Sequence, residues 1–324
     1  MDDREYERIC SLTAFPAADA TPRLSVTEER FVIIKKQLHH RHLRLALRRH
    51  GQDRHLTRYL ARRAAGESSC SIATSVAFSP CMMARLLLKA QYGWSKTTIA
   101  KLFKEAMKDR ARLDGKVRWT IGGSSQVVSE EDYAKVIPEI RECIDADEYC
   151  SPLADRVRHS IGQEYEDLLL MTLRNRQLLF ESEEMLREKG LSKTPDVRLL
   201  LPIGVRDPKN GQQLHVVNWI DSKAMFGDRY THETENASQL QGYVNRFGPG
   251  MVIYWFGYVA QLSSDSDVFV TDSFPREIFL PGAFDPLASV TKVRKGDVVE
   301  LRSAKVQTDF DEDWIPMTSV VCEW

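Results

Sequence analysis

Two apolar runs separated by a polar turn occupy the middle of the chain. Residues 196–205 and 213–221 form the runs, and residues 207–211 between them contain Pro208 and an Asn-Gly pair. Runs of this length around such a turn predict a β-hairpin. The hairpin is the clearest structural element that the hydrophobic pattern predicts.

Helical and strand patterns flank this hairpin. Apolar residues recur at helical spacing over residues 161–171, before the hairpin. After it, residues 233–244 predict a helix that stops at a Gly-Pro-Gly stretch, and residues 251–257 predict an apolar strand. The expected order is therefore helix, hairpin, helix and strand.

Helical patterns dominate the chain from about residue 26 to residue 150. Residues 1–25, which carry proline breakers, predict an irregular N-terminus. Pro80 after Ser79 predicts the start of one helix, and a glycine-containing turn separates it from another over residues 97–107. This outline is compatible with a helix-turn-helix that binds DNA, although any helical hairpin has the same outline.

Two carboxylates and a lysine flank the predicted hairpin. Asp196 precedes the first strand, Asp221 ends the second, and Lys223 follows two residues later. If the hairpin closes about residues 208–210, Asp196 lies opposite Asp221 or Lys223, and directly opposed Cβ atoms are about 4.5–5.5 Å apart. Asp221 and Lys223 share a face of an extended strand. The three side chains are therefore expected in one small patch.

Such a patch has a chemical and a structural interpretation. Adjacent carboxylates repel unless a cation or a shared proton lies between them. Oxygen ligands suit Mg²⁺, and a neighbouring lysine can hold or deprotonate water and balance the charge of a phosphate, as phosphodiester hydrolysis requires. Glu166 on the preceding helix could add a third carboxylate. The structural alternative is a solvated ion pair between Asp196 and Lys223, because this motif is short and has many chance matches.

Four strings at fitting intervals resemble the TPD-motif family of the PD-(D/E)XK nuclease superfamily, which is described as similar to Holliday-junction resolvases. They are residues 193–196 (KTPD), residues 219–224 (WIDSKA) with 226–228, residues 245–250 (NRFGPG) and residues 252–255 (VIYW). The resemblance covers roughly residues 72–260. Their order makes the resemblance more specific than any one string alone.

The resemblance implies an α+β fold, in which an all-helical N-terminal region precedes a restriction-endonuclease-like core with a mixed central sheet flanked by helices. It implies metal-binding acids at Glu166, Asp196 and Asp221, with Lys223 and Gln239 as further catalytic residues. Mg²⁺, with Mn²⁺ as an alternative, is the implied cofactor, and DNA, including branched DNA, is the implied substrate. A codanin-like protein is the implied partner. The family usually has Glu at the position of Asp221, so this shorter acid departs from the pattern.

A basic segment is concealed by the overall net charge of −1. Residues 35–63 contain ten Lys or Arg and one acid, Asp53. Basic side chains along a helix release counterions from nucleic acid, so the segment is a candidate DNA-binding surface; a solvated helix or a docking face for an acidic partner is the alternative. The candidate contacts are Lys35, Lys36, Arg41, Arg44, Arg48 and Arg49.

Composition argues against several classes of protein and indicates a cellular compartment. Six cysteines without a C-x-x-C pair argue against structural zinc or a disulfide framework. The charged start and the lack of 18 consecutive apolar residues predict neither a secretory signal nor a membrane span. A reducing compartment is therefore expected, the nucleus first and the cytoplasm second.

The predicted organisation has four parts, and the sequence makes no prediction about the oligomeric state. They are an irregular N-terminus (1–25), a helical region (26–150), a nuclease-like domain (151–283) and a C-terminal extension (284–324). The predicted function is that of a metal-dependent DNA endonuclease. The alternative is a non-catalytic DNA-binding or adaptor protein that uses the nuclease fold to dock a partner.

Overall fold

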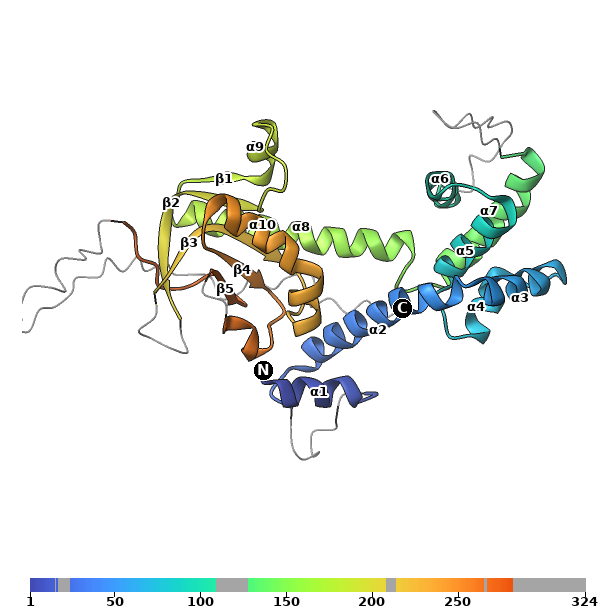
Figure 1. Cartoon of the computed structure of the whole chain (residues 1–324), viewed down its shortest axis with the longest axis horizontal. Coiled ribbons are helices and arrows are strands. Elements are labelled where there is room, and N and C mark those ends of the chain that lie inside the picture. The colour runs from blue at the N-terminus through green and yellow to red at the C-terminus, as the bar shows by residue number, and fades with distance from the viewer. Residues whose placement is uncertain (15, 17–23, 109–127, 208–213, 265–266, 282–324) are drawn as a thin grey trace, which may run out of the picture. The chain divides into compact units, whose positions relative to one another are not determined.

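A computed structural model describes residues 1–14, 16, 24–108, 128–207, 214–264 and 267–281 (Figure 1). The chain forms two compact units. The sheet unit comprises Met1–Lys35 and Ser160–Trp324, and the helical unit comprises Lys36–His159. Residues up to Lys35 thus pack with the sheet, whereas the sequence-based division grouped residues 26–150 together. The predicted extension and the hairpin turn at 208–213 lie outside the described residues.

The helical unit is built from short helices around two apolar clusters. Its helices are α3 (Asp53–Ala64), α4 (Ser69–Ser75), α5 (Pro80–Tyr92), α6 (Lys96–Ala106) and α7 (Glu130–Asp145), with parts of α2 (Glu28–His50) and α8 (Pro152–Asn175). One cluster contains Phe103 and Ile140, and the other contains Tyr59 and Leu87. The predicted all-helical N-terminal region is confirmed.

Capping residues set the limits of α5 and α6. Ser79 accepts a hydrogen bond from the backbone N–H of Met82, and Pro80 occupies the first turn. Gly93 ends α5 in the left-handed conformation, at φ 66°, which glycine adopts without steric cost. The predicted pair of helices is therefore present, and its DNA-binding role stays a prediction.

The sheet unit contains a five-stranded mixed sheet whose strands lie side by side in chain order (Figure 1). The strands are β1 (Phe180–Ser182), β2 (Val197–Arg206), β3 (Leu214–Lys223), β4 (Gly250–Tyr254) and β5 (Val268–Thr271). The pairs β1–β2 and β2–β3 are antiparallel, while β3–β4 and β4–β5 are parallel. The predicted α+β class with a mixed sheet is confirmed.

Two helices bring side chains to this sheet. Leu169 and Leu173 of α8 belong to the same apolar core as Val197 and Ile253. On α10 (Ala237–Phe247), Tyr243 packs edge-on against Trp219, with ring centroids 5.2 Å apart. The residues before α10, predicted as its first turn, form the π-helix η2 (Thr231–Asn236). The remaining short elements are the helix α9 (Glu183–Glu188) and the 3₁₀ helix η3 (Ala260–Ser264).

The expected irregular N-terminus is wrong for α1 (Asp3–Ser11). Asp2 caps this helix, and the ring of Tyr6 stacks on Phe226 with centroids 5.6 Å apart. The amino group of Met1 donates to the carbonyl oxygen of Tyr258 at 3.1 Å. Contacts with distant residues therefore stabilise this helix. The first proline, Pro16, follows the end of α1 and does not interrupt it.

Candidate active site

The β2–β3 hairpin brings Asp196 to Asp221, as the sequence predicts. Val197 pairs with Ile220, so the same register places Asp196 opposite Asp221. The backbone N–H of Ser222 donates to Asp196 Oδ2 at 2.6 Å. Asp196 is therefore fixed by the neighbouring strand rather than exposed at a loose strand end.

An irregularity in β2 is responsible for this register. Near the turn, Arg206 pairs with Leu214, and this register alone would place Asp196 beyond Lys223. The pairing shifts between Arg198 and Ile203, a stretch that contains Pro202. Proline cannot donate to a strand neighbour and is typical of bulges. The shift in β2 therefore restores the approach of the two aspartates.

Asp221 is fully buried, and its two oxygens differ in their surroundings. Its Oδ2 lies 2.7 Å from Nζ of Lys223, whose side chain is 18% exposed. Among the described residues, Oδ1 has no hydrogen-bond partner. A buried carboxylate oxygen without a donor is costly, because its desolvation is not compensated. The ion pair of Lys223 is thus with Asp221, within the buried site, and not the solvated pair with Asp196 that the structural alternative required.

Burial raises the pKa of both aspartates. For Asp196 the nearby charge of Asp221 raises the pKa further, while Lys223 opposes the rise. For Asp221 Lys223 also opposes the effect of burial. Burial lowers the pKa of Lys223, but the charges of Asp221 and Asp196 outweigh this effect and raise it. The lysine therefore stays an ammonium ion between acids that resist ionisation.

Glu166 reaches the same electrostatic environment from α8. Burial raises the pKa of its carboxyl, the charge of Glu183 raises it further, and Lys223 opposes both. The predicted helix over residues 161–171 is confirmed within α8, so the third acid comes from the element that the sequence indicated. Glu166, Asp196 and Asp221 thus interact through their charges.

Gln239 lies between Lys223 and Tyr243 in a chain of hydrogen bonds that ends at Thr194. Tyr243 donates its hydroxyl proton to the carbonyl oxygen of Thr194 at 2.9 Å and accepts from Nε2 of Gln239 at 2.6 Å. Because the phenol proton is already committed, the amide must present its nitrogen to Tyr243 and its oxygen to the lysine. Nζ of Lys223 then donates to Gln239 Oε1 at 3.4 Å. Gln239 therefore lies at the site predicted for it.

Sequence reasoning missed Tyr243 and Glu183. Tyr243 is four residues after Gln239 and shares its helix face, which could have indicated a common role. Glu183 begins α9, whose N-cap is Ser182. A serine followed by acids signals the start of a helix and could have indicated α9. That signal does not place β1 and α9 beside the hairpin, because both elements are too short to show a periodic pattern.

The donor set fits a hard divalent cation. Carboxylate oxygens are the preferred ligands of Mg²⁺, and a cation would supply the partner that Asp221 Oδ1 lacks. In the described part of the chain, no three His, Cys, Asp or Glu side chains are grouped closely enough to hold an ion as they stand. Glu166, Asp196 and Asp221 are the residues that would hold one, with side-chain adjustment.

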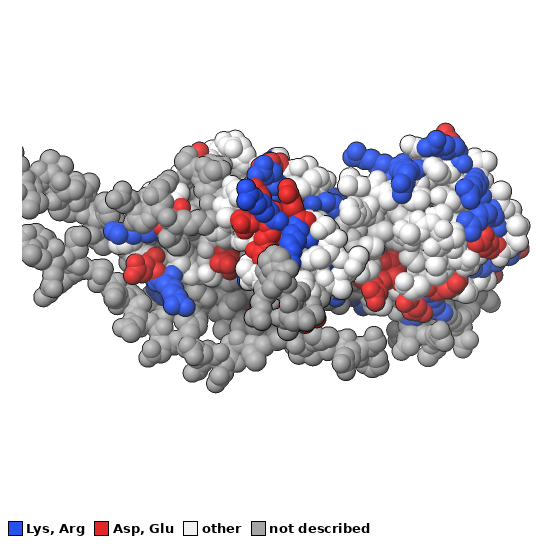
Figure 2. Space-filling model, turned by 90° about the horizontal axis from the view of Figure 1, so that it is seen from below, with Lys and Arg blue, Asp and Glu red and all other residues white. Residues whose placement is uncertain are grey.

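The candidate DNA-binding residues differ in exposure. Nζ of Lys35 donates to the carbonyl oxygen of Cys10 at 3.0 Å, at the end of α1, so this lysine has a structural contact within the sheet unit. The exposed residues are Lys36, Arg44, Arg48 and Arg49, and Arg41 is half-buried. The face shown in Figure 2 carries basic and acidic side chains close together in one area and a row of mainly basic side chains in another.

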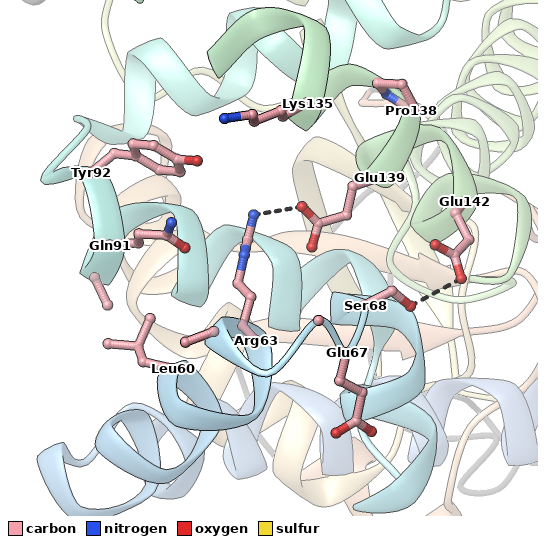
Figure 3. A pocket seen from close by; sticks show the side chains of 13 residues that line it. Leu60, Arg63, Glu67, Ser68, Gln91, Tyr92, Lys135, Pro138, Glu139 and Glu142 are labelled. Atoms are coloured by element: carbon pink, nitrogen blue, oxygen red, sulfur yellow. Dashed lines mark hydrogen bonds and ion pairs between the residues drawn. The ribbon is translucent and has the colours of Figure 1, made fainter. Parts of the chain in front are cut away.

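The helical unit contains a cavity of about 940 Å³ between α3, α5 and α7 (Figure 3). Arg63 enters it from α3 and pairs with Glu139 at 2.5 Å, and Ser68 donates to Glu142 at 3.1 Å. These polar side chains therefore have partners in the cavity wall.

Over the described residues, no helix combines the length and apolar character that crossing a membrane requires.

The fold and site define an α+β protein with a buried acid–lysine centre on a mixed sheet. Residues 132–274 match the family described as "Protein of unknown function TPD sequence-motif". This part of the chain is therefore similar to the TPD-motif family, as the sequence indicated.

Relatives of this chain are named "CDAN1-interacting nuclease 1". That of Danio rerio is 36% identical over 209 residues, 64% of this chain and 62% of the relative. That of Xenopus laevis is 40% identical over 147 residues, 45% and 46% of the two chains, and that of Mus musculus is 34% identical over 212 residues, 64% and 66%. The chain thus spans between about half and two thirds of the length of these relatives. No solved structure matches the chain.

Proposed function

We propose that this chain is a metal-dependent DNA endonuclease of the PD-(D/E)XK type. The observation that carries this proposal is the buried Asp221, whose Oδ1 lacks a partner although Asp196 and Glu166 add negative charge nearby. A carboxylate in this situation is suited to a cation rather than to a structural hydrogen bond. The name of the relatives, which describes them as nucleases, supports the same class.

Each residue of the site has a distinct task in this proposal. Glu166, Asp196 and Asp221 hold Mg²⁺ or Mn²⁺, which when bound lowers the pKa of water and neutralises charge on a phosphate. Lys223, kept protonated beside Asp221, orients the attacking water and balances the negative charge that develops on the phosphate. Gln239, aligned by Tyr243, holds the ammonium group in place. Together these groups would supply an activated water and charge balance for phosphodiester hydrolysis.

The proposed substrate follows from the basic residues of α2, and the proposed partner follows from the name of the relatives. The exposed basic residues of α2 contact DNA phosphates in this proposal, with branched DNA among the substrates. A codanin-like protein is the proposed partner, because the relatives are named for an interaction with CDAN1. The nucleus is the expected compartment for such a protein, with the cytoplasm as the second.

A second candidate function is that of a non-catalytic adaptor. The name of the relatives also favours it, since an interaction with CDAN1 needs no catalysis. In that case the acid–lysine centre would be retained without turnover. Binding of the partner, and not DNA cleavage, would then be the function of this chain.

Cleavage assays distinguish the two functions. Purified wild-type chain is incubated with linear, flap and four-way-junction DNA and with RNA, with and without Mg²⁺. Cleavage that needs Mg²⁺ and is lost in Asp221→Ala supports the nuclease. Asp272→Ala, which removes an exposed acid of the sheet unit, is the matched control and should cleave normally. Equal residual cleavage by wild type and Asp221→Ala would indicate a contaminant and favour the adaptor.

A further inference from the structure

Glu183 contacts both ends of the turn that carries the Thr-Pro-Asp motif. Its backbone N–H donates to the carbonyl oxygen of Asp196 at 2.9 Å. Its carboxylate oxygen Oε1 accepts from the hydroxyl of Thr194 at 3.2 Å. Since Ser182 pairs with Val197 in the sheet, these contacts start from a fixed strand position. Glu183 is therefore placed beside the site by the same sheet that places Asp196.

The charge of Glu183 acts on the site. With burial, it raises the pKa of Glu166, and it also raises the pKa of Asp221. Arg187, one helical turn later, lies 2.6 Å from Glu183 Oε1 and offsets part of this charge. The guanidinium is mostly exposed, so solvent screens the pair and the offset is incomplete.

A neighbouring acid, Glu181, is more fully neutralised than Glu183, which has one largely exposed partner. Glu181, two residues earlier, is buried and pairs with Lys189 and with Arg198, the latter at 3.3 Å. These cations lower the pKa of Glu181. Glu181 is thus neutralised by two cations, whereas the charge of Glu183 acts on the acids Glu166 and Asp221.

We propose that Glu183 is a positioning residue that strengthens divalent-cation binding at the Asp196–Asp221 centre, by fixing the Thr194 side of the turn and adding a fourth negative charge. This inference rests on the proposed metal-dependent function. It assigns to Glu183 no contact with the reacting phosphate. Its effect is on cation affinity, and the rate at saturating cation should change little.

Cation titration of the full chain tests this role without cleavage. Mn²⁺ binding is measured by calorimetry for the wild type, Glu183→Gln, Arg187→Gln and Glu188→Gln. Glu183→Gln keeps an acceptor for Thr194 and removes the charge, so binding should weaken about tenfold, the scale of one screened charge near a divalent cation. Arg187→Gln frees the Glu183 charge and should tighten binding about twofold. Glu188→Gln removes an exposed acid at the far end of α9 and should leave affinity unchanged.

The outcomes separate this inference from the proposed function. Unchanged Mn²⁺ affinity in Glu183→Gln, or an Arg187→Gln variant that binds more weakly, would overturn the role of Glu183. Equal affinity of wild type and Asp221→Asn would instead overturn the metal site itself. Single-turnover cleavage at saturating Mn²⁺ completes the test, because Glu183→Gln should then cleave within about threefold of the wild-type rate. A loss of rate that saturating cation does not restore would contradict a role in affinity.

Discussion

The two units each bury an aspartate, and the surroundings of these aspartates are opposite. In the helical unit, Asp147 accepts hydrogen bonds from the hydroxyl of Ser79 and from the backbone N–H groups of Cys81 at 3.0 Å, Tyr149 at 3.0 Å and Cys150 at 2.8 Å. In the sheet unit, Asp221 has the ion pair with Lys223, and Oδ1 accepts no hydrogen bond from the described residues.

This difference separates a structural carboxylate, Asp147, from Asp221, which we propose binds a cation. The donors to Asp147 belong to the ends of neighbouring helices and loops, so folding itself compensates the loss of water. The desolvation of Asp221 is compensated only at Oδ2, by Lys223, and the adjacent acids add repulsion. Folding alone does not favour such an arrangement. In the proposed function, a bound cation would favour it.

The largest expected effect concerns the structural carboxylate. Asp147→Asn should lower the free energy of unfolding of the helical unit by about 3 kcal/mol, because the amide nitrogen would face backbone donors that then lose their acceptor. Chemical denaturation measures the change. Asp145→Asn, at an exposed position two residues earlier, is the control and should change stability by less than about 0.5 kcal/mol. Equal stability of Asp147→Asn and wild type would show that these hydrogen bonds do not hold the unit together.

The next effect concerns Lys223 of the proposed active site. Lys223→Ala should retain DNA and metal binding while its cleavage rate falls by about 10² or more, the scale of a positioned acid–base group. Single-turnover cleavage at saturating Mg²⁺ isolates this chemical step. Lys189→Ala is the matched control, because Lys189 pairs with the structural acid Glu181 and should affect stability rather than rate. A near-wild-type rate for Lys223→Ala would remove it from the mechanism.

A smaller effect is expected for the exposed arginines of α2. Arg48→Ala with Arg49→Ala should weaken DNA binding about equally for all sequences and reduce the salt dependence by roughly one unit of slope per lost phosphate contact. Titrations at several salt concentrations measure the slope. Arg62→Ala, which removes an arginine already paired with Glu67, is the control. An unchanged slope would assign this face of α2 to a protein partner.

The elements that carry the site could be predicted because their signals are local. The hairpin, the part of α8 that carries Glu166, and α10 each show an apolar period that the structure confirms. The opposition of Asp196 and Asp221 followed from their symmetry about the turn. The irregularity of β2 that produces this register could not be foreseen, because a shift in pairing depends on both strands.

The elements that were missed depend on distant contacts. Helix α1 is stabilised by Phe226 and Tyr258, more than 200 residues away in sequence. The three-residue strand β1 has too few positions to show an alternation, yet its pairing with β2 is what brings Glu183 to the site. Burial of Asp221 likewise results from the packing of the sheet. It is this burial, and not the motif alone, that distinguishes a strained carboxylate from a surface ion pair.

The raised pKa of Asp221 links its burial to pH. Its pKa in the folded, metal-free protein lies above the ordinary value, so the folded state holds the proton more tightly than the unfolded state. Stability therefore falls as pH rises through the interval between the two values and stays lower above it. Asp221→Asn removes this dependence, so the mutant should have its largest stability advantage near neutral pH and a smaller one near pH 4. Parallel unfolding at the two pH values measures the difference.

Thermal unfolding of wild type and Asp221→Asn, each with and without Mg²⁺, tests most directly whether this carboxylate serves a cation. Without Mg²⁺ the mutant should melt at the same temperature as the wild type or higher, since an uncompensated charge is gone. Mg²⁺ at about 100 times its Kd should stabilise the wild type by about 2.7 kcal/mol and leave the mutant unchanged. A mutant that melts well below the wild type without metal, with no effect of Mg²⁺ on either chain, would show that Asp221 is a structural residue like Asp147.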